Sequence, residues 1–196
     1  MREKVCFGGT FNPIHHGHLI CARAAAEAVG AKTVVVFPAG IPAHKAGEEQ
    51  IAPADDRLEM CRITLSSQAG FELDDREVRR AGPTYTIDTA TQLKRQGWTE
   101  VHWIIGADMV NFLPRWHEID QLLQVVQFIV MARPGWKFEW DRLPKAVQRL
   151  KENIVEVPQI DISATEIRRR VKAGLPIDYL CPPEVCRYIE QRGLYR

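Results

Sequence analysis

Short apolar runs alternate with amphipathic or alanine-rich stretches along the whole chain. Runs of β-branched and aromatic residues predict buried strands, and apolar residues three and four positions apart predict helices. We expect strands at residues 4–9, 32–40, 71–75, 100–108, 127–135 and 153–158. We expect helices at residues 17–30, 53–68, 84–97, 118–126, 143–153, 163–174 and 182–193. The segment 134–145 is rich in Trp, Pro and charge, which is typical of a surface loop.

This alternation of strand and helix predicts an α/β fold: a Rossmann-like parallel sheet with helices on both faces, formed by residues 1–196 as one domain. In open α/β sheets, ligands bind beyond the carboxyl ends of the strands. Five strands are followed by unusual residues: GGTFNPIHHGH, GIPAHK, GADM, RPG and DISATEIR. We therefore expect the functional site where these five strand ends meet.

Composition narrows the range of partners. The 196 residues carry 26 basic and 25 acidic side chains, a net charge of +1, which disfavours nucleic acid as a partner. No apolar run is long enough to cross a membrane, and the charged start MREK lacks the apolar core of a signal peptide. The five cysteines contain no C-x-x-C pair and are expected as buried thiols. The sequence thus predicts a cytoplasmic protein without a membrane partner.

The segment GGTFNPIHHGH, residues 8–18, contains three glycines and three histidines. It matches neither the dinucleotide fingerprint G-x-G-x-x-G nor the P-loop pattern. Three interpretations compete: a zinc site built on the histidines, a purely structural turn, and a phosphate site. A zinc site lacks a clear carboxylate or thiol partner nearby. The phosphate site is favoured because glycines admit phosphate close to the backbone, and His18 lies where a helix N-terminus attracts anions.

A second anion-friendly helix start is predicted at DISATEIRRR, residues 161–170. Ser163 and Glu166 fit the S-x-x-E capping box, which alone would indicate only a helix start. Thr165 adds a hydroxyl, and Arg168 adds a positive charge. Arg169 and Arg170 are expected on a solvated face.

Other strand ends carry further candidates, each with an ordinary alternative. His44 and Lys45 follow the second strand and are either solvated or in contact with a ligand, and the same holds for Arg133. Asp108 could bind ribose hydroxyls or a hydrated magnesium ion, or cap the next helix. Trp116 is either a packing residue or a stacking platform for a flat ring. Thr84, Tyr85 and Thr86 open a helix whose amides could hold a carboxylate.

Taken together, these motifs resemble a known enzyme family. GGTFNPIHHGH resembles the nucleotidyltransferase signature G-[ST]-F-[DN]-P-x-H-x-G-H, and ISATEIR resembles the second signature, I-S-[ST]-T-x-x-R. The segments RLEMC, YTIDT, IIGADM, LPRWH, ARPG and YLCPPEV resemble bacterial nicotinate-nucleotide adenylyltransferases in order and spacing, over residues 4–195. Asn12, Ala43 and Ala164 depart from the commonest pattern, and Ala164 removes one hydroxyl that could bond to phosphate.

The resemblance implies that ATP and nicotinate mononucleotide react to give nicotinate adenine dinucleotide and pyrophosphate, in NAD biosynthesis, with Mg²⁺ as cofactor. The mononucleotide phosphate would attack the α-phosphorus of ATP in line, without a covalent enzyme intermediate. His18, His15 and Arg168 would be catalytic, and Mg²⁺ would be held by substrate phosphates and water rather than by protein ligands. A homo-oligomer is compatible with the sequence.

The resemblance also implies the residues that bind each substrate. ATP would contact Gly8, Gly9, Thr10, Phe11, His15, His18, Lys45, Gly106, Asp108, Arg133, Ser163, Thr165 and Arg168. Nicotinate mononucleotide would contact His44, Lys45, Tyr85, Thr86, Asp108, Trp116 and His117. The ring would lie against Trp116, and backbone amides near Thr86 would hold its carboxylate, which suits the acid better than the amide.

Three alternatives stay open at this point. Another nucleotidyltransferase of the superfamily, acting on phosphopantetheine or nicotinamide mononucleotide, would share both signatures, although YTIDT and LPRWH argue against it. A nucleotide sensor without turnover would bind ATP and release no pyrophosphate. A histidine metal site would retain stoichiometric zinc.

Overall fold

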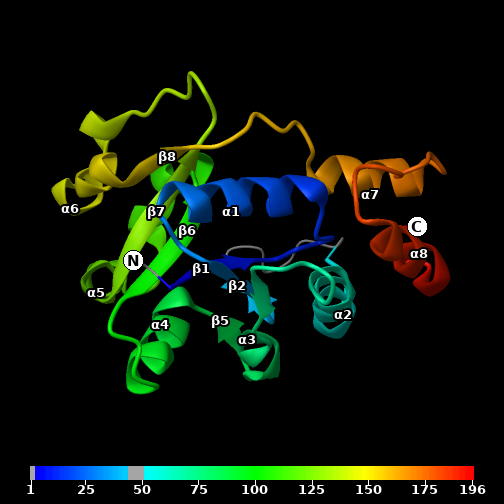
Figure 1. Cartoon of the computed structure of the whole chain (residues 1–196), viewed down its shortest axis with the longest axis horizontal. Coiled ribbons are helices and arrows are strands. Elements are labelled where there is room, and N and C mark those ends of the chain that lie inside the picture. The colour runs from blue at the N-terminus through cyan, green and yellow to red at the C-terminus, as the bar shows by residue number, and fades with distance from the viewer. Residues whose placement is uncertain (1–2, 44–50) are drawn as a thin grey trace. The chain divides into compact units, whose positions relative to one another are not determined.

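The fold is built on a six-stranded sheet (Figure 1). The structure is a computed structural model, and it describes residues 3–43 and 51–196. Its sheet strands are β1 Lys4–Gly9, β2 Thr33–Pro38, β4 Phe71–Leu73, β6 Val101–Gly106, β7 Val126–Ala132 and β8 Ile154–Glu156. A second, two-stranded sheet pairs β3 Ile41–Pro42 with β5 Pro83–Thr84 in parallel.

Most helices lie between strands along the chain, and the last two follow the final strand. The α-helices are α1 His16–Ala28, α2 Ala54–Leu65, α3 Arg76–Arg79, α4 Thr86–Arg95, α5 Ile119–Val125, α6 Lys145–Gln148, α7 Ala164–Lys172 and α8 Pro183–Arg192. Short 3₁₀ segments are η2 Ala107–Asn111, η3 Leu113–Arg115, η4 Trp140–Arg142 and η5 Arg149–Asn153.

The strand order of the large sheet is β4-β2-β1-β6-β7-β8. β1 pairs with β6, β6 with β7, and β7 with β8, all in parallel. From β1 the chain adds β2 and then β4 on one side, and from β6 it adds β7 and then β8 on the other side. In open α/β sheets, ligands commonly bind at such a reversal of strand order. The parallel α/β sheet that the sequence predicts is confirmed.

The chain divides into two compact units, which are described separately below. Unit 1 contains Met1–Gly8, Cys21–Val35 and Tyr85–Gln159, and unit 2 contains Gly9–Ile20, Val36–Thr84 and Ile160–Arg196. The organisation as one domain stays a prediction. Within unit 1, α4 packs against α5, and β6, β7 and β8 lie side by side. Within unit 2, α2 packs against α8 (Figure 1).

The central strands are mostly apolar because both faces of a parallel sheet are covered. Val34, Val35, Val36 and Phe37 of β2 are buried, and so are Val101 to Ile105 of β6. The predicted strands and helices agree with the structure to within a few residues. One difference is the helix expected at residues 143–153, which is divided into α6 and the 3₁₀ segment η5. The strands β3 and β5 and the helix α3 were not predicted, because two to four residues are too few to show a period.

The cysteines agree with the prediction in part. All five are free thiols; Cys6, Cys61 and Cys181 are buried, whereas Cys21 and Cys186 are partly exposed. Among residues 3–43 and 51–196, the helices are all too short or too polar to span a membrane.

Candidate functional site

The two glycines at the end of β1 are required by packing. A Cβ atom on Gly8 would lie 2.6 Å from the indole of Trp103, which fills the space beside it in unit 1. In unit 2, a Cβ on Gly9 would lie 3.0 Å from the ring of Phe11. An aromatic ring thus occupies the space beside each glycine, and packing alone accounts for both residues.

In unit 2 the loop after Gly9 enters α1 through a sharp turn. Phe11 has a φ angle of 47°, in the left-handed region that a bulky residue rarely adopts, and a cis peptide bond joins Asn12 to Pro13. The Phe11 ring is buried and lies edge-on to the ring of His18, with centroids 5.1 Å apart. The turn therefore places Phe11 beneath the first residues of the helix.

His15 and His18 cap the N-terminus of α1 with their side chains. The backbone N–H of His18 donates to Nδ1 of His15, and the N–H of His15 donates to Nδ1 of His18, both at 3.3 Å. Since α1 begins at His16, this is the geometry of a capping box, with imidazoles in place of the usual Ser and Glu. The two rings are stacked with centroids 3.6 Å apart. The spacing H-x-x-H is thus explained by helix capping.

The environment of this capping box keeps both imidazoles neutral. Burial, with a smaller contribution from His16, lowers the pKa of His15 from 6.5 to about 4. Loss of hydration, followed by the proximity of His15, lowers the pKa of His18 well below its usual value. Because each Nδ1 accepts a backbone N–H, the proton of each neutral ring resides on Nε2. The helix start therefore presents two Nε2–H donors with no charge of their own.

The second signature also lies in unit 2, at the start of α7. Ser163 caps this helix, because its Oγ accepts the backbone N–H of Glu166 at 3.2 Å. The reciprocal half of the predicted capping box is not formed; the Glu166 carboxylate instead accepts two hydrogen bonds from Arg169 at 2.7 Å. Arg169 is exposed, as predicted for a solvated face.

Arg168 joins the two signatures within unit 2. Its Nη1 donates to the main-chain carbonyl of Asn12 at 2.9 Å, and its Nη2 lies 3.4 Å from Oγ1 of Thr165. Its buried Nε has no hydrogen-bond partner among the described residues. The main-chain carbonyl of Ile162 also lies close to α1, 3.4 Å from where a Cβ of Gly17 would be. The structure thus brings together the segments 9–18 and 162–168, as the sequence predicts.

Asn12 connects this loop to two further parts of unit 2. Its Oδ1 accepts the hydroxyl of Tyr195 at 2.8 Å and the backbone N–H of Ala52 at 3.0 Å. Asn12 is only 5% exposed. Sequence reasoning missed Tyr195, because a single tyrosine 183 positions from its partner has no local signal.

Arg57 is the second functional candidate that sequence reasoning missed. It lies in α2, is 1% exposed, and donates to the carbonyls of Thr10, Ala39, Gly40 and Ala52. The carbonyl of Thr10 is thereby directed towards Arg57. An arginine among charged residues of a helix is typical of a surface position, and main-chain partners are invisible in a sequence.

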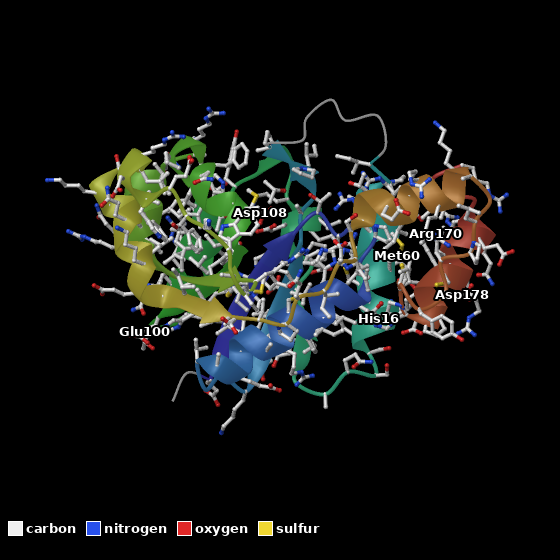
Figure 2. All side chains as sticks on the ribbon, turned by 90° about the horizontal axis from the view of Figure 1, so that it is seen from above. His16, Met60, Glu100, Asp108, Arg170 and Asp178 are labelled. Atoms are coloured by element: carbon white, nitrogen blue, oxygen red, sulfur yellow. The ribbon has the colours of Figure 1, made fainter. Side chains whose placement is uncertain are left out.

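In unit 1, the end of β6 presents Asp108. Gly106 leaves space for it, since a Cβ there would collide with Oδ1 of Asp108. Asp108 is exposed and lies in η2, whose first residues receive no side-chain cap, so the capping alternative is not observed. Figure 2 labels Asp108, which follows β6, and Glu100, which precedes it at the other end of the strand. Arg133 follows β7 and is exposed.

Unit 1 also holds the residues expected to contact the mononucleotide. Tyr85 and His117 are stacked, with ring centroids 4.2 Å apart. Tyr85 and Thr86 begin α4, which has no side-chain cap at its N-terminus. Trp116 is partly exposed and packs edge-on to Phe128, 6.0 Å between centroids. The structure brings Tyr85 and His117 together, and it fixes one edge of Trp116.

His44 and Lys45 lie outside the described residues. Among the residues that are described, no three His, Cys, Asp or Glu side chains gather in a group suited to a metal ion.

Comparison with known proteins identifies relatives over nearly the whole chain. Residues 6–170 match the family model described as cytidylyltransferase-like. The nicotinate-nucleotide adenylyltransferase of Bacillus subtilis is 38% identical over 196 residues, 100% of this chain and 99% of that protein. A probable nicotinate-nucleotide adenylyltransferase of Geobacillus thermodenitrificans is 43% identical over 190 residues, 96% of this chain and 84% of that protein.

A solved structure has the same fold. The Plasmodium falciparum nicotinic acid mononucleotide adenylyltransferase complexed with NaAD superimposes with a TM-score of 0.78 at 19% identity, over 100% of this chain and 98% of that one.

Proposed function

Because the chain belongs to the nicotinate-nucleotide adenylyltransferases, within the cytidylyltransferase-like family, we propose that it transfers the adenylyl group of ATP to nicotinate mononucleotide. The products are nicotinate adenine dinucleotide and pyrophosphate. This reaction contributes to NAD biosynthesis.

The meeting of the two signatures in unit 2 carries this proposal. The histidine capping box offers two Nε2–H donors at a helix N-terminus, where backbone amides and the helix dipole favour an anion. Arg168, bonded to the Asn12 carbonyl, adds a positive charge, and its buried Nε has no partner among the described residues. These groups together are suited to a polyphosphate.

The chemistry requires positioning more than proton transfer. The 5′-phosphate of the mononucleotide is already an anion, so it can attack the α-phosphorus of ATP without a general base. The bond from the α-phosphorus to the bridging oxygen breaks, and pyrophosphate leaves with its electron pair. The enzyme must hold two anions together and stabilise the charge that spreads over the reacting phosphates. We assign the α-phosphate contact to His18, and the β- and γ-phosphates to His15, Lys45 and Arg168.

The neutral state of the imidazoles suits this role. A neutral Nε2–H donates a hydrogen bond without losing its proton, so it neither transfers a proton to the leaving group nor depends on pH near neutrality. Burial is the main cause of the low pKa of both rings, with a smaller contribution from His16 at His15 and from His15 at His18. Helix capping therefore fixes both the orientation and the tautomer of the two donors.

The start of α4 in unit 1 supports nicotinate as the acceptor ring. The first amides of a helix have no intrahelical partner, and here no side chain caps them. These N–H groups can donate to a carboxylate, whereas the NH₂ of nicotinamide is itself a donor and could not accept a hydrogen bond from them. We assign the carboxylate to the backbone at Thr86 with Tyr85 and His117, and the ring to Trp116. Gly106, Asp108 and Arg133 remain assigned to the adenosine part of ATP, and Asp108 also to the mononucleotide.

Mg²⁺ is proposed as the cofactor. It prefers oxygen ligands, retains several waters and commonly binds through substrate phosphates with one or two carboxylates. Asp108, an exposed carboxylate at a strand end, is a donor of the right kind, and the main ligands would be phosphate oxygens and water. When bound, the ion neutralises charge on the triphosphate. Chelation with EDTA should abolish turnover and leave the melting temperature of the nucleotide-free protein unchanged; a lower melting temperature would indicate a protein-held ion.

The reaction is tested by pyrophosphate release from ATP with nicotinate mononucleotide, beside nicotinamide mononucleotide and phosphopantetheine as alternative acceptors. We expect turnover with the acid and much less with the amide. Binding of ATP without pyrophosphate release from any acceptor would instead indicate a sensor. Stoichiometric zinc in the purified protein would indicate a metal site.

We also propose that the enzyme acts in the cytoplasm, and a homo-oligomer is compatible with its sequence. The free thiols suit a reducing compartment. Light scattering coupled to gel filtration would determine the oligomeric state.

A further inference from the structure

The buried guanidinium of Arg57 has an unusual set of partners. Nε donates to the carbonyl of Ala52 at 3.0 Å, Nη1 to the carbonyls of Thr10 at 2.8 Å and Ala39 at 2.6 Å, and Nη2 to that of Gly40 at 2.6 Å. All four acceptors are main-chain carbonyls of loops in unit 2. Among the described residues, no carboxylate forms an ion pair with it.

A buried cation without a counter-charge is costly, since it gives up its hydration. Burial accordingly lowers the pKa of Arg57, and the group remains held by four carbonyl dipoles. An apolar side chain could fill the same space without this cost. What only the guanidinium provides is a rigid, planar set of donors that fixes several carbonyls relative to one another.

The carbonyls that it fixes belong to loops of the proposed site. Thr10 lies between Gly9 at the end of β1 and the turn into α1. Ala39 and Gly40 follow β2, and the N–H of Ala39 donates to the carbonyl of Gly9 at 2.9 Å. Arg57 thus ties together the loops that follow two neighbouring strands.

These hydrogen bonds of Arg57 lie next to the strained residue of the loop that follows β1. Phe11, with its φ of 47°, lies between the carbonyls of Thr10 and Asn12. Arg57 holds the first of these carbonyls and Arg168 holds the second. A residue in a sparsely populated conformation persists only where its surroundings determine it. Since the Phe11 ring lies against His18, the position of Phe11 affects where the two imidazoles point.

We propose that Arg57 is a positioning residue for adenylyl transfer, which sets the loop bearing His15 and His18 by holding the Thr10 carbonyl to those of Ala39 and Gly40. The proposal rests on the proposed function. Arg57 itself touches no reacting atom and acts through the loop.

The test replaces Arg57 with lysine, which keeps the charge and has no planar fork. The matched control is Arg62→Lys on the same helix, since Arg62 is exposed and, among the residues that the structure describes, pairs only with Glu59. Initial rates of pyrophosphate release give kcat and both KM values per folded enzyme. For Arg57→Lys we expect kcat to fall by up to about 100-fold, the cost of a misplacement near 1 Å, and the KM for ATP to rise. The KM for nicotinate mononucleotide should change little, and Arg62→Lys should match the wild type.

A role in folding alone would give a different result. Both arginine variants are therefore assayed with and without sucrose, which favours the folded state, and folding is followed by near-ultraviolet circular dichroism. A loss of kcat that persists in folded Arg57→Lys supports positioning. Recovery of wild-type kcat by Arg57→Lys in sucrose would overturn the positioning role. Equal changes in the KM for ATP and the KM for nicotinate mononucleotide would overturn it as well.

Arg57→Met is the second variant, in case the lysine variant does not fold. It removes the buried charge and keeps an unbranched apolar stem, and the same loss of kcat is expected; an unchanged kcat would overturn the proposal. If the wild type itself releases no pyrophosphate, the proposed function fails. Calorimetric binding of Mg-ATP then still compares the wild type with Arg57→Lys, and unchanged affinity would refute positioning of the loop.

Discussion

His18 and His16 lie two positions apart in α1 and have different surroundings. The His18 ring completes the helix cap and lies against Phe11, whereas the His16 backbone N–H donates to the Leu180 carbonyl and its side chain is partly exposed. His18→Ala should raise the reaction barrier by about 2.7–4 kcal/mol, the cost of one lost transition-state donor. The measurement is kcat at saturating ATP, with His16→Ala as control. Near-normal turnover of His18→Ala would exclude the assigned role.

Trp116 is anchored by one edge to Phe128 and leaves its ring partly exposed. If the nicotinate ring stacks on it, Trp116→Ala should weaken binding of the mononucleotide by about 1–3 kcal/mol, the range for a base on an aromatic side chain. The KM for the mononucleotide should therefore rise while the KM for ATP stays constant. Trp136→Ala, another exposed tryptophan of unit 1, is the control. Equal effects on both KM values would mean that Trp116 is only a packing residue.

At this scale the sequence revealed some contacts and concealed others. Ser163 was predicted because a helix start requires a capping side chain at a fixed spacing. His15, His18 and Arg168 were instead selected as phosphate-binding candidates through the two signatures, and the capping role of the histidines emerged only in the structure. Arg57 was not predicted, since its partners are carbonyls, which every residue has. The pairing of Asn12 with Tyr195 was also hidden, because the two residues are neighbours only in the folded chain.

Because His15 caps the start of α1, the free energy of unfolding should depend on pH. The native pKa of His15 is about 4, below its ordinary 6.5, so the unfolded chain binds more protons between these values. The free energy of unfolding should therefore decrease as the pH falls from 6.5 to 4, by about 3 kcal/mol in total, at about 1.4 kcal/mol per pKa unit. Urea unfolding at a series of pH values measures this decrease.

The variant His15→Asn provides the comparison for this pH series. Asn is a good helix cap that does not titrate, so its oxygen can accept the same N–H while the proton-linked contribution disappears. The wild type should lose more stability than this variant over the same pH interval. Identical slopes would show that His15 is not the titrating group.

Elements were predicted well where their pattern is long. The β-branched run of β2 and the apolar face of α2 are determined by burial, which a sequence records directly. The two-residue strands β3 and β5 pair because Gly40 brings its chain against Thr84, whose Oγ1 accepts the Gly40 N–H at 3.1 Å. Such a close approach depends on tertiary contacts, and two residues are too few to show the alternation of apolar and polar positions that predicts a strand.

Over the whole molecule, each compact unit is assembled from three separate stretches of chain. Unit 2 accordingly depends on contacts between distant residues. Tyr195→Phe removes the hydroxyl that donates to the buried Asn12, and should lower the free energy of unfolding by about 1 kcal/mol. Tyr179→Phe is the control, because Tyr179 is 91% exposed. Urea unfolding compares the two, and equal stabilities would show that the Asn12 bond contributes nothing.

The same bond between Asn12 and Tyr195 bears on when the protein can first bind ATP. During synthesis, residues 9–18 leave the ribosome long before residue 195 exists, so the loop must wait for the partner that completes its hydrogen bonds. Closing so long a loop is also entropically expensive and slow compared with forming local helices. Helices should therefore form early, both on the ribosome and in refolding, and the ability to bind ATP should be among the last properties that the chain acquires.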